Sequence, residues 1–123
     1  MGLPKTHRLR NRQDYRAVYG QGLRRYSPHL TLIALRNRHN QGTDFTTATS
    51  FGISISKKVS KKAVVRNRIK RQIKGAIRCC LQGIEPGWKI VIVVKPKAIE
   101  CKYEHFLREL EELLKQAKII NGY

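Results

Sequence analysis

The segment that most constrains the fold is the stretch 57–80, which reads KKVSKKAVVRNRIKRQIKGAIRCC. Ten of its first 22 residues are lysine or arginine, and none is acidic. Placed at about 100° per residue around a helix axis, the stretch separates into two faces. An apolar stripe holds Val65, Ile69, Ile73, Ala76 and Cys80, and the opposite face holds Asn67, Arg71, Lys74 and Arg78. This pattern predicts a helix that packs on a core with one face and meets polyanions with the other.

Arg66 and Arg68 fall on the two flanks of that apolar stripe, an arrangement suited to phosphate oxygens. Ser60 is the expected N-cap, which puts Lys61 and Lys62 in the first turn, where the helix dipole already makes the potential positive. A phosphate bound at the helix start would relieve this conflict. The alternative is an ordinary solvated basic face. We favour the polyanion because no acid stands at helical spacing to neutralise these charges.

The charge of the whole chain points to the same class of partner. The formal net charge is +18 over 123 residues, far beyond what solubility requires. Residues 1–80 hold 19 basic residues against two acids, Asp14 and Asp44, whereas residues 81–123 hold seven against six. We therefore expect a nucleic acid or an anionic membrane to contact the first two thirds of the chain. A membrane is less favoured, because a surface-bound helix would carry bulky residues opposite its charge.

The sequence carries no recognisable targeting or catalytic motif. No apolar run approaches the roughly 20 residues that span a bilayer and no signal-peptide core is present, so we expect a cytoplasmic protein without a membrane partner. Three cysteines give neither a disulfide framework nor a C-x-x-C pair, and the four histidines show no metal-ligand spacing. A two-metal nuclease needs several acidic residues to hold its ions, and the strongly basic residues 1–80 contain only two, Asp14 and Asp44. We predict no catalytic residue, no bound metal and no cofactor on the protein itself.

The N-terminal region combines basic and aromatic residues. Residues 1–10 form a basic arm that we expect to be either extended or partly disordered when free. A short helix is predicted at 12–19, capped by Asn11 and ended by the glycines at 20 and 22. Tyr15 and Tyr19 share one face of it, either as core residues or as rings that stack on unpaired bases. In the second case Arg12 and Arg16 would follow the backbone of the nucleic acid.

The remaining segments predict a mixed α/β domain. Strands are expected at 29–36, at 46–56 and, as a buried strand, at 89–95, with a weaker signal at 23–26. The strand at 46–56 has a small, polar face, which would suit either the floor of a groove or a solvent-exposed edge. A closing helix at 103–118 places Phe106, Leu110, Leu113, Leu114 and Ala117 on one stripe.

The stretch 54–78 resembles the signature of the bacterial ribonuclease P protein subunit; it reads SISKKVSKKAVVRNRIKRQIKGAIR. That subunit is the basic partner of a catalytic RNA that removes 5′ leaders from precursor tRNAs. The resemblance covers most of the chain, which we treat as one ribonuclease P protein domain, 1–123. It implies an α/β two-layer sandwich, helix–strand–strand–strand–helix–strand–helix, resembling a domain of ribosomal proteins. It also implies a left-handed crossover, against the usual right-handed rule. A ribosomal protein or RNA chaperone without an enzymatic role is the alternative.

The resemblance also assigns partners and residues. It implies two partners, ribonuclease P RNA and precursor tRNA, with no DNA expected, and Mg²⁺ that is required by the RNA. By motif match, the contact with the catalytic RNA falls to Arg66, Asn67, Arg68, Lys70, Arg71 and Lys74. The groove that takes the single-stranded leader is assigned Tyr15, Tyr19, Ile33, Arg12 and Arg16. Ile33 departs from the family pattern, because the matching position is commonly aromatic.

Overall fold

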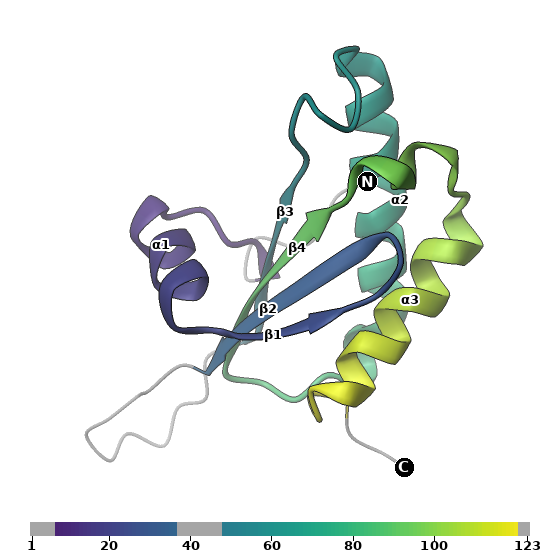
Figure 1. The fold of residues 1–123 in the computed structure, drawn as a ribbon. Helices are drawn as coiled ribbons and strands as arrows, with labels where there is room; N and C mark the ends of the chain where they lie inside the picture. The colour runs from purple at the N-terminus through teal and green to yellow at the C-terminus, as the bar shows by residue number, and fades with distance from the viewer. Residues whose placement is uncertain (1–6, 37–47, 121–123) are drawn as a thin grey trace, which may run out of the picture.

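The protein is described by a computed structural model that covers residues 7–36 and 48–120 (Figure 1). Asp44 and the first residues of the predicted 46–56 strand lie outside these ranges. The elements follow in the predicted order: α1 Arg12–Gln21, β1 Leu23–Tyr26, β2 Leu30–Arg36, β3 Ser50–Ser54, α2 Ala63–Cys80, β4 Trp88–Val94 and α3 Tyr103–Gln116. Two short 3₁₀ helices are added, η2 at Leu81–Gly83 and η3 at Pro96–Glu100. The mixed α/β class is confirmed.

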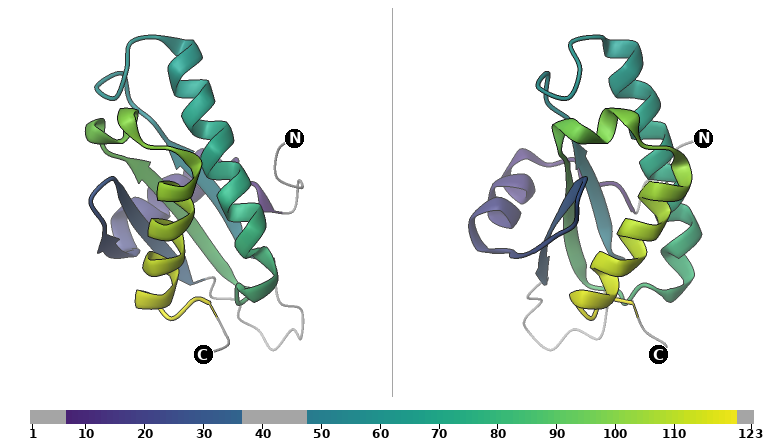
Figure 2. Two further views of the ribbon diagram at one scale, coloured as in Figure 1. Left: turned by 90° about the vertical axis from the view of Figure 1, so that its right-hand side faces the viewer. Right: turned by 45° about the vertical axis from the view of Figure 1, so that its right-hand side comes forward.

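The four strands form one sheet in the order β1-β2-β4-β3. β2 pairs antiparallel with β1 and with β4, whereas β3 pairs parallel with β4. The connection from β3 to β4 runs through α2. In the left panel of Figure 2, which faces the α2 and α3 side, β3 runs upward to the right of β4 with α2 in front of them. The crossover is therefore left-handed, as the family resemblance implies.

The helices lie on opposite faces of the sheet, α1 on one and α2 with α3 on the other (Figures 1 and 2). β4 is buried on both faces, as predicted: Val91 packs towards α1, whereas Ile90 and Ile92 belong to the larger core beneath α2 and α3. The closing helix buries the stripe expected of it, Phe106, Leu110, Leu113, Leu114 and Ala117. α1 thus adds a third, partial layer to the two-layer sandwich.

The basic arm is extended where the structure describes it: Arg8 pairs in parallel with Phe51, and the N–H of the buried Leu9 donates to the Phe51 carbonyl at 2.8 Å, so this part of the arm lies beside β3. One local prediction is wrong. α2 begins at Ala63 with Lys62 as its N-cap, not at Ser60. The Ser60 hydroxyl instead accepts from the Lys62 N–H at 3.1 Å, which forms a turn before the helix.

None of the helices within the described ranges is long and apolar enough to cross a membrane.

Candidate nucleic-acid interface

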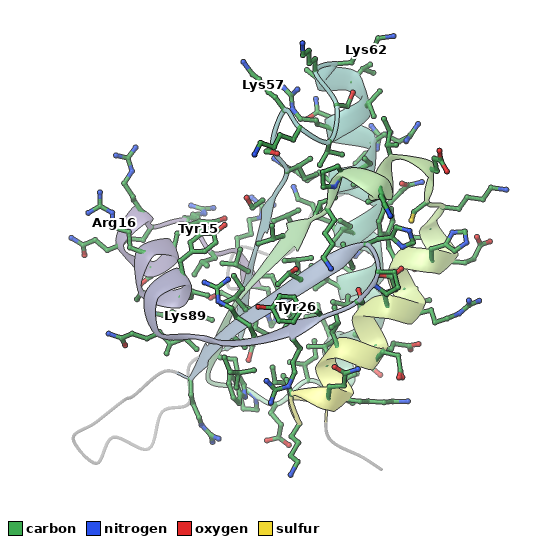
Figure 3. All side chains as sticks on the ribbon, viewed as in Figure 1. Tyr15, Arg16, Tyr26, Lys57, Lys62 and Lys89 are labelled. Atoms are coloured by element: carbon green, nitrogen blue, oxygen red, sulfur yellow. The ribbon has the colours of Figure 1, made fainter. Side chains whose placement is uncertain are left out.

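α2 presents a basic face because its apolar stripe is buried against the sheet and α3. The predicted stripe is confirmed at Ile69, Ile73, Ala76 and Cys80, and Ile77 is buried as well, whereas Val65 is only half-buried. The polar side carries Asn67, Arg68, Arg71 and Arg78, all exposed. Figure 3 shows Lys57 and Lys62 extending from the end of the molecule at which α2 begins. Exposed basic side chains are thus present before the helix, along it and in its last turn, at Arg78.

Arg66 and Arg68 are both positioned by hydrogen bonds to backbone carbonyls. Arg66 donates from Nη1 to the Ser60 carbonyl oxygen at 2.8 Å, and Arg68 donates from Nη2 to the Ile99 carbonyl oxygen at 3.3 Å. Ser60 precedes α2 and Ile99 belongs to η3, so the two guanidinium groups reach different segments. A guanidinium carries five N–H donors, so each arginine keeps capacity to bind a phosphate after one internal bond.

A groove of about 170 Å³ lies where the N-terminal arm, α1, β3 and α2 meet. Its cationic residues come from the arm and from α2, and its apolar and aromatic residues come mainly from α1 and β3. The lining consists of Arg8, Leu9, Arg10, Tyr15, Phe51, Gly52, Ile53, Lys70 and Lys74. Among the residues that the structure describes, no acidic side chain lines this groove, so its potential is positive.

Tyr15 provides the aromatic surface of the groove. Figure 3 shows its side chain directed from α1 towards the sheet, whereas Arg16 points away from it. The ring lies directly over Gly52 of β3, where no side chain intervenes. Burial, and then the proximity of Tyr19, raise the pKa of the Tyr15 phenol, so it is a neutral hydrogen-bond donor at physiological pH. The small face predicted for this strand is therefore the floor of a groove at Gly52.

Tyr19 and the two arginines of α1 lie outside the lining of that groove. Tyr19 is 39% exposed, and its carbonyl oxygen accepts from Arg24 Nη2 at 2.9 Å. Arg12 and Arg16 are exposed on the same helix. These three side chains are accessible to a polyanion that extends beyond the groove, but the structure does not bring them together with Tyr15 in one cavity.

Ile33 is not accessible, and its assignment to the groove is wrong. Its exposed fraction is 0%, and it belongs to the small core under α1 together with Leu9, Val18 and Val91. A Cβ built on Gly22 would lie 2.8 Å from the Ile33 Cγ2, so the end of α1 closes tightly over this residue. Ile33 supports the helix that carries Tyr15 and touches no solvent.

Asp14 is paired inside the protein. Its Oδ1 accepts from the Lys89 ammonium at 2.8 Å, which ties α1 to β4. Of the two acids in the charged part of the chain, Asp44 lies outside the described residues. The described part of the charged region thus offers no pair of carboxylates to hold two metal ions.

The sequence did not reveal that the basic face of α2 adjoins the groove beside Tyr15. It predicted Lys70 and Lys74 as part of the α2 surface alone, whereas both are half-buried and line the groove. It also gave no role to Arg8 and Arg10 of the arm. The alternation of these arginines around the buried Leu9 is a strand-like signal that would have placed both side chains on one face.

Comparisons with known proteins agree with one another. The family model for ribonuclease P matches residues 3–118. The chain is 58% identical to the ribonuclease P protein component of Microcystis aeruginosa over 123 residues, with 100% of both chains covered. It is 56% identical to the corresponding component of Rippkaea orientalis over 123 residues, covering 100% of this chain and 95% of the relative.

Solved structures resemble the fold closely. The RNase P protein of Staphylococcus aureus superposes with a TM-score of 0.79 at 25% identity, covering 94% of this chain and 98% of that one. The RNase P protein of Thermotoga maritima gives a TM-score of 0.74 at 25% identity, with the same coverage of 94% and 98%.

Proposed function

This chain belongs to the ribonuclease P protein family, and from that premise we propose that it binds both the catalytic RNA of the enzyme and the 5′ leader of precursor tRNA. As a protein component of ribonuclease P, it is part of an endoribonuclease that processes tRNA. RNA-bound Mg²⁺ catalyses cleavage of the phosphodiester bond between the leader and the tRNA. The protein acts in the cytoplasm as an accessory subunit. It removes no leader by itself.

The observation that carries the proposal is the position of Tyr15 in a cationic groove. An aromatic ring gives any base a stacking surface, and the surrounding cations hold the backbone without reading its sequence. Such a site accepts single strands of many sequences, as a leader-binding site must. A double helix keeps its base faces stacked inside, so it gains nothing from the ring.

The exposed face of α2 is the surface for the catalytic RNA. Arg66, Asn67, Arg68 and Arg71 provide it, and the bonds to the Ser60 and Ile99 carbonyls support a fixed position for the two flanking guanidinium groups. Lys70 and Lys74 lie between this face and the groove, so they are placed to contact both RNAs. The leader would then pass close to the protein–RNA contact, which aligns the substrate with the catalytic RNA.

The lack of usable carboxylates supports catalysis by the RNA. Asp14 is paired with Lys89, and the groove has no acid among its described lining residues. A strongly positive surface concentrates phosphates but gives a metal ion no oxygen ligands. The protein contributes binding, and the Mg²⁺ ions belong to the RNA.

Reconstitution tests this function. The protein is mixed with a ribonuclease P RNA and a 5′-extended tRNA at an Mg²⁺ concentration too low for the RNA alone, and leader release is followed on a gel. We expect cleavage only when protein and RNA are both present. Cleavage by the protein after removal of all RNA would overturn RNA catalysis, and no stimulation of the RNA would overturn the subunit role.

A further inference from the structure

Three side chains of metal-ligating type meet on the side of the molecule away from α1. His29 stands in the turn before β2, Cys101 stands between η3 and α3, and Glu109 lies on α3. One ligand atom from each of the three lies within 4.8 Å of the other two. These residues are 72 and 8 positions apart in the sequence, so no spacing motif reveals them. Only the fold brings them together.

Internal hydrogen bonds hold the Glu109 carboxylate in place. Its Oε1 accepts from the Ser27 hydroxyl and from the His29 N–H at 3.0 Å, and its Oε2 lies 2.6 Å from His29 Nδ1. Cys101 is only 8% exposed, and the side chains of Glu109 and His29 are 13% and 28% exposed. The cluster is thus built into the junction between the β1–β2 turn and α3, with little freedom for its members to move apart.

The donor types select the kind of ion. A thiolate, an imidazole and a carboxylate are ligands of Zn²⁺ and similar transition metals, whereas Mg²⁺ takes oxygen ligands. Around a tetrahedral zinc ion these donor atoms lie roughly 3.3–3.8 Å apart, as follows from bond lengths of about 2.0–2.3 Å. The three atoms already lie within 4.8 Å of one another, close to this spacing.

A cavity of about 500 Å³ gives the cluster access to solvent. His29 and Cys101 line it, together with Lys97, Ile99, Glu100 and His105. His105 caps the start of α3 through its Nδ1 and does not belong to the group whose ligand atoms lie within 4.8 Å of one another, so we assign the fourth coordination position to water. This cavity shares no lining residue with the groove beside Tyr15.

We propose that the protein binds one divalent transition-metal ion of the Zn²⁺ class at His29, Cys101 and Glu109. Binding releases the Cys101 thiol proton to solvent. The proton between His29 Nδ1 and the Glu109 carboxylate moves to His29 Nε2, so that two metal–ligand bonds replace the His29–Glu109 hydrogen bond. The ion joins segments that are far apart in the sequence, and the unfolded chain does not hold them together. It therefore stabilises the folded state. This ion is separate from the Mg²⁺ that the RNA requires.

Cobalt spectroscopy tests the site directly, with tag-free full-length protein titrated with Co²⁺ under reducing conditions. We expect thiolate-to-cobalt charge-transfer absorption and tetrahedral d–d bands that saturate at about one equivalent and are abolished by Zn²⁺ but not by excess Mg²⁺. The bands disappear in Cys101→Ala and persist in Cys79→Ala, a control at an exposed cysteine outside the cluster. Absence of the bands in the wild type, or their survival in Cys101→Ala, would overturn the site.

Thermal unfolding provides a second readout with a milder variant. Glu109→Gln keeps an oxygen for Ser27 and the His29 N–H but removes the carboxylate charge. We expect Zn²⁺ to raise the melting temperature of the wild type and to leave that of Glu109→Gln nearly unchanged, each compared with its own metal-free melt. Equal Zn²⁺ shifts in both proteins, or no shift in the wild type, would show that the cluster is only a hydrogen-bonded network.

Discussion

The Tyr15 phenol fills the space that a side chain at position 52 would need. A Cβ built on Gly52 would lie 2.2 Å from the Tyr15 hydroxyl oxygen, far inside van der Waals contact. Tyr15 comes from α1 and Gly52 from the edge strand β3, so a missing side chain on the strand lets the ring rest on the sheet. This close approach explains a glycine in the middle of a strand, where it otherwise weakens the structure.

Gly52→Ala should therefore move the Tyr15 ring and impair leader binding. We expect the affinity for leader-bearing tRNA, measured with the reconstituted holoenzyme, to fall by about 1–3 kcal/mol, the contribution of one stacked base. Affinity for mature tRNA should change little, because it has no leader to stack.

Gly20→Ala is the matched control. Gly20 is in α1, and a Cβ there would meet nothing within 4 Å. Alanine in an exposed helix position stabilises by about 0.5–1 kcal/mol relative to glycine. This variant should melt slightly higher and discriminate leaders normally. A Gly52→Ala protein that discriminates as well as Gly20→Ala would show that the ring position is irrelevant to the leader.

The two tyrosines of α1 should differ in effect. Tyr15→Leu keeps an apolar side chain against the sheet but removes the ring from the groove, so we expect a loss of about 1–3 kcal/mol in the preference for precursor over mature tRNA. Tyr19→Leu lies outside the groove lining and should cost less. Because Ile33 is buried, the double variant should lose the binding free energy of about one stacked base and not of three.

Equilibrium binding of precursor and mature tRNA to each assembled variant provides the measurement. Assembly with the catalytic RNA is followed separately and should be normal for both single variants. Normal discrimination in a correctly folded Tyr15→Leu protein would return this residue to a purely structural role.

The sequence predicts the elements of this fold better than it predicts the surfaces between them. Periodicity identified the buried stripe of α2 and the doubly buried β4, because each of these follows from local spacing against one core. It could not show that Ile33 lies under α1. Helices cover both faces of this sheet, so an apolar residue on a strand is expected to be buried whichever face it is on. The packing of α1 on β2 and β4 decides that question.

The same limit applies to the charged residues. Lys70 and Lys74 have the spacing of a solvated helix face, and only the path of the N-terminal arm along β3 turns that face into the wall of a groove. Glu109 lies outside the apolar stripe of the closing helix, yet contacts with the β1–β2 turn leave its side chain only 13% exposed. Burial disfavours its charged form, but hydrogen bonds from Ser27 and His29 outweigh this, so the pKa of Glu109 is lowered.

The neighbouring cysteines of α2 should react very differently. Cys79 is exposed, whereas Cys80 is buried, and burial, assisted by Glu111 and Cys79, raises the pKa of the Cys80 thiol to about 11. Only the thiolate is alkylated, so at pH 8 the native protein should be labelled at Cys79 and spared at Cys80. Peptide mass spectrometry after iodoacetamide treatment measures both sites.

The pH dependence of Cys80 has a defined direction. Its pKa is higher in the folded state than in the unfolded chain, so the folded state holds the proton more tightly. The stabilisation is present at pH below the unfolded pKa of about 9 and is lost as the pH rises towards 11. Labelling of Cys80 in a Cys79→Ala protein should increase over that interval. Rapid labelling at pH 8 in the folded protein would contradict the burial of this thiol.

Arg66→Ala and Arg68→Ala should each weaken assembly with the catalytic RNA by about 1–3 kcal/mol, the range for a lost charge-assisted contact. Arg66 is half-buried with a 2.8 Å bond to the Ser60 carbonyl, so its loss should also cost about 0.5–1.5 kcal/mol of folding stability. Arg68 is exposed and its bond is longer, 3.3 Å, so its melting temperature should barely change.

Titration of labelled RNA and thermal melts of the free proteins separate these effects. An Arg68→Ala protein that melts much lower but assembles normally would mean that the arginine serves the fold and not the RNA.

Single substitutions at Lys74 and Arg71 test whether the groove beside Tyr15 and the exposed face of α2 adjoin, because each removes one positive charge. Lys74 lines the groove beside Tyr15, whereas Arg71 is exposed on α2 and lies outside the groove lining. Each neutralised phosphate contact contributes about one unit to the slope of log affinity against log salt concentration. Arg71→Gln should reduce this slope for assembly with the catalytic RNA alone. Lys74→Gln should reduce it for assembly and also weaken binding of leader-bearing tRNA relative to mature tRNA. If both variants affect assembly equally and neither changes leader discrimination, the leader does not approach α2, and the groove and the basic helix serve their RNAs independently.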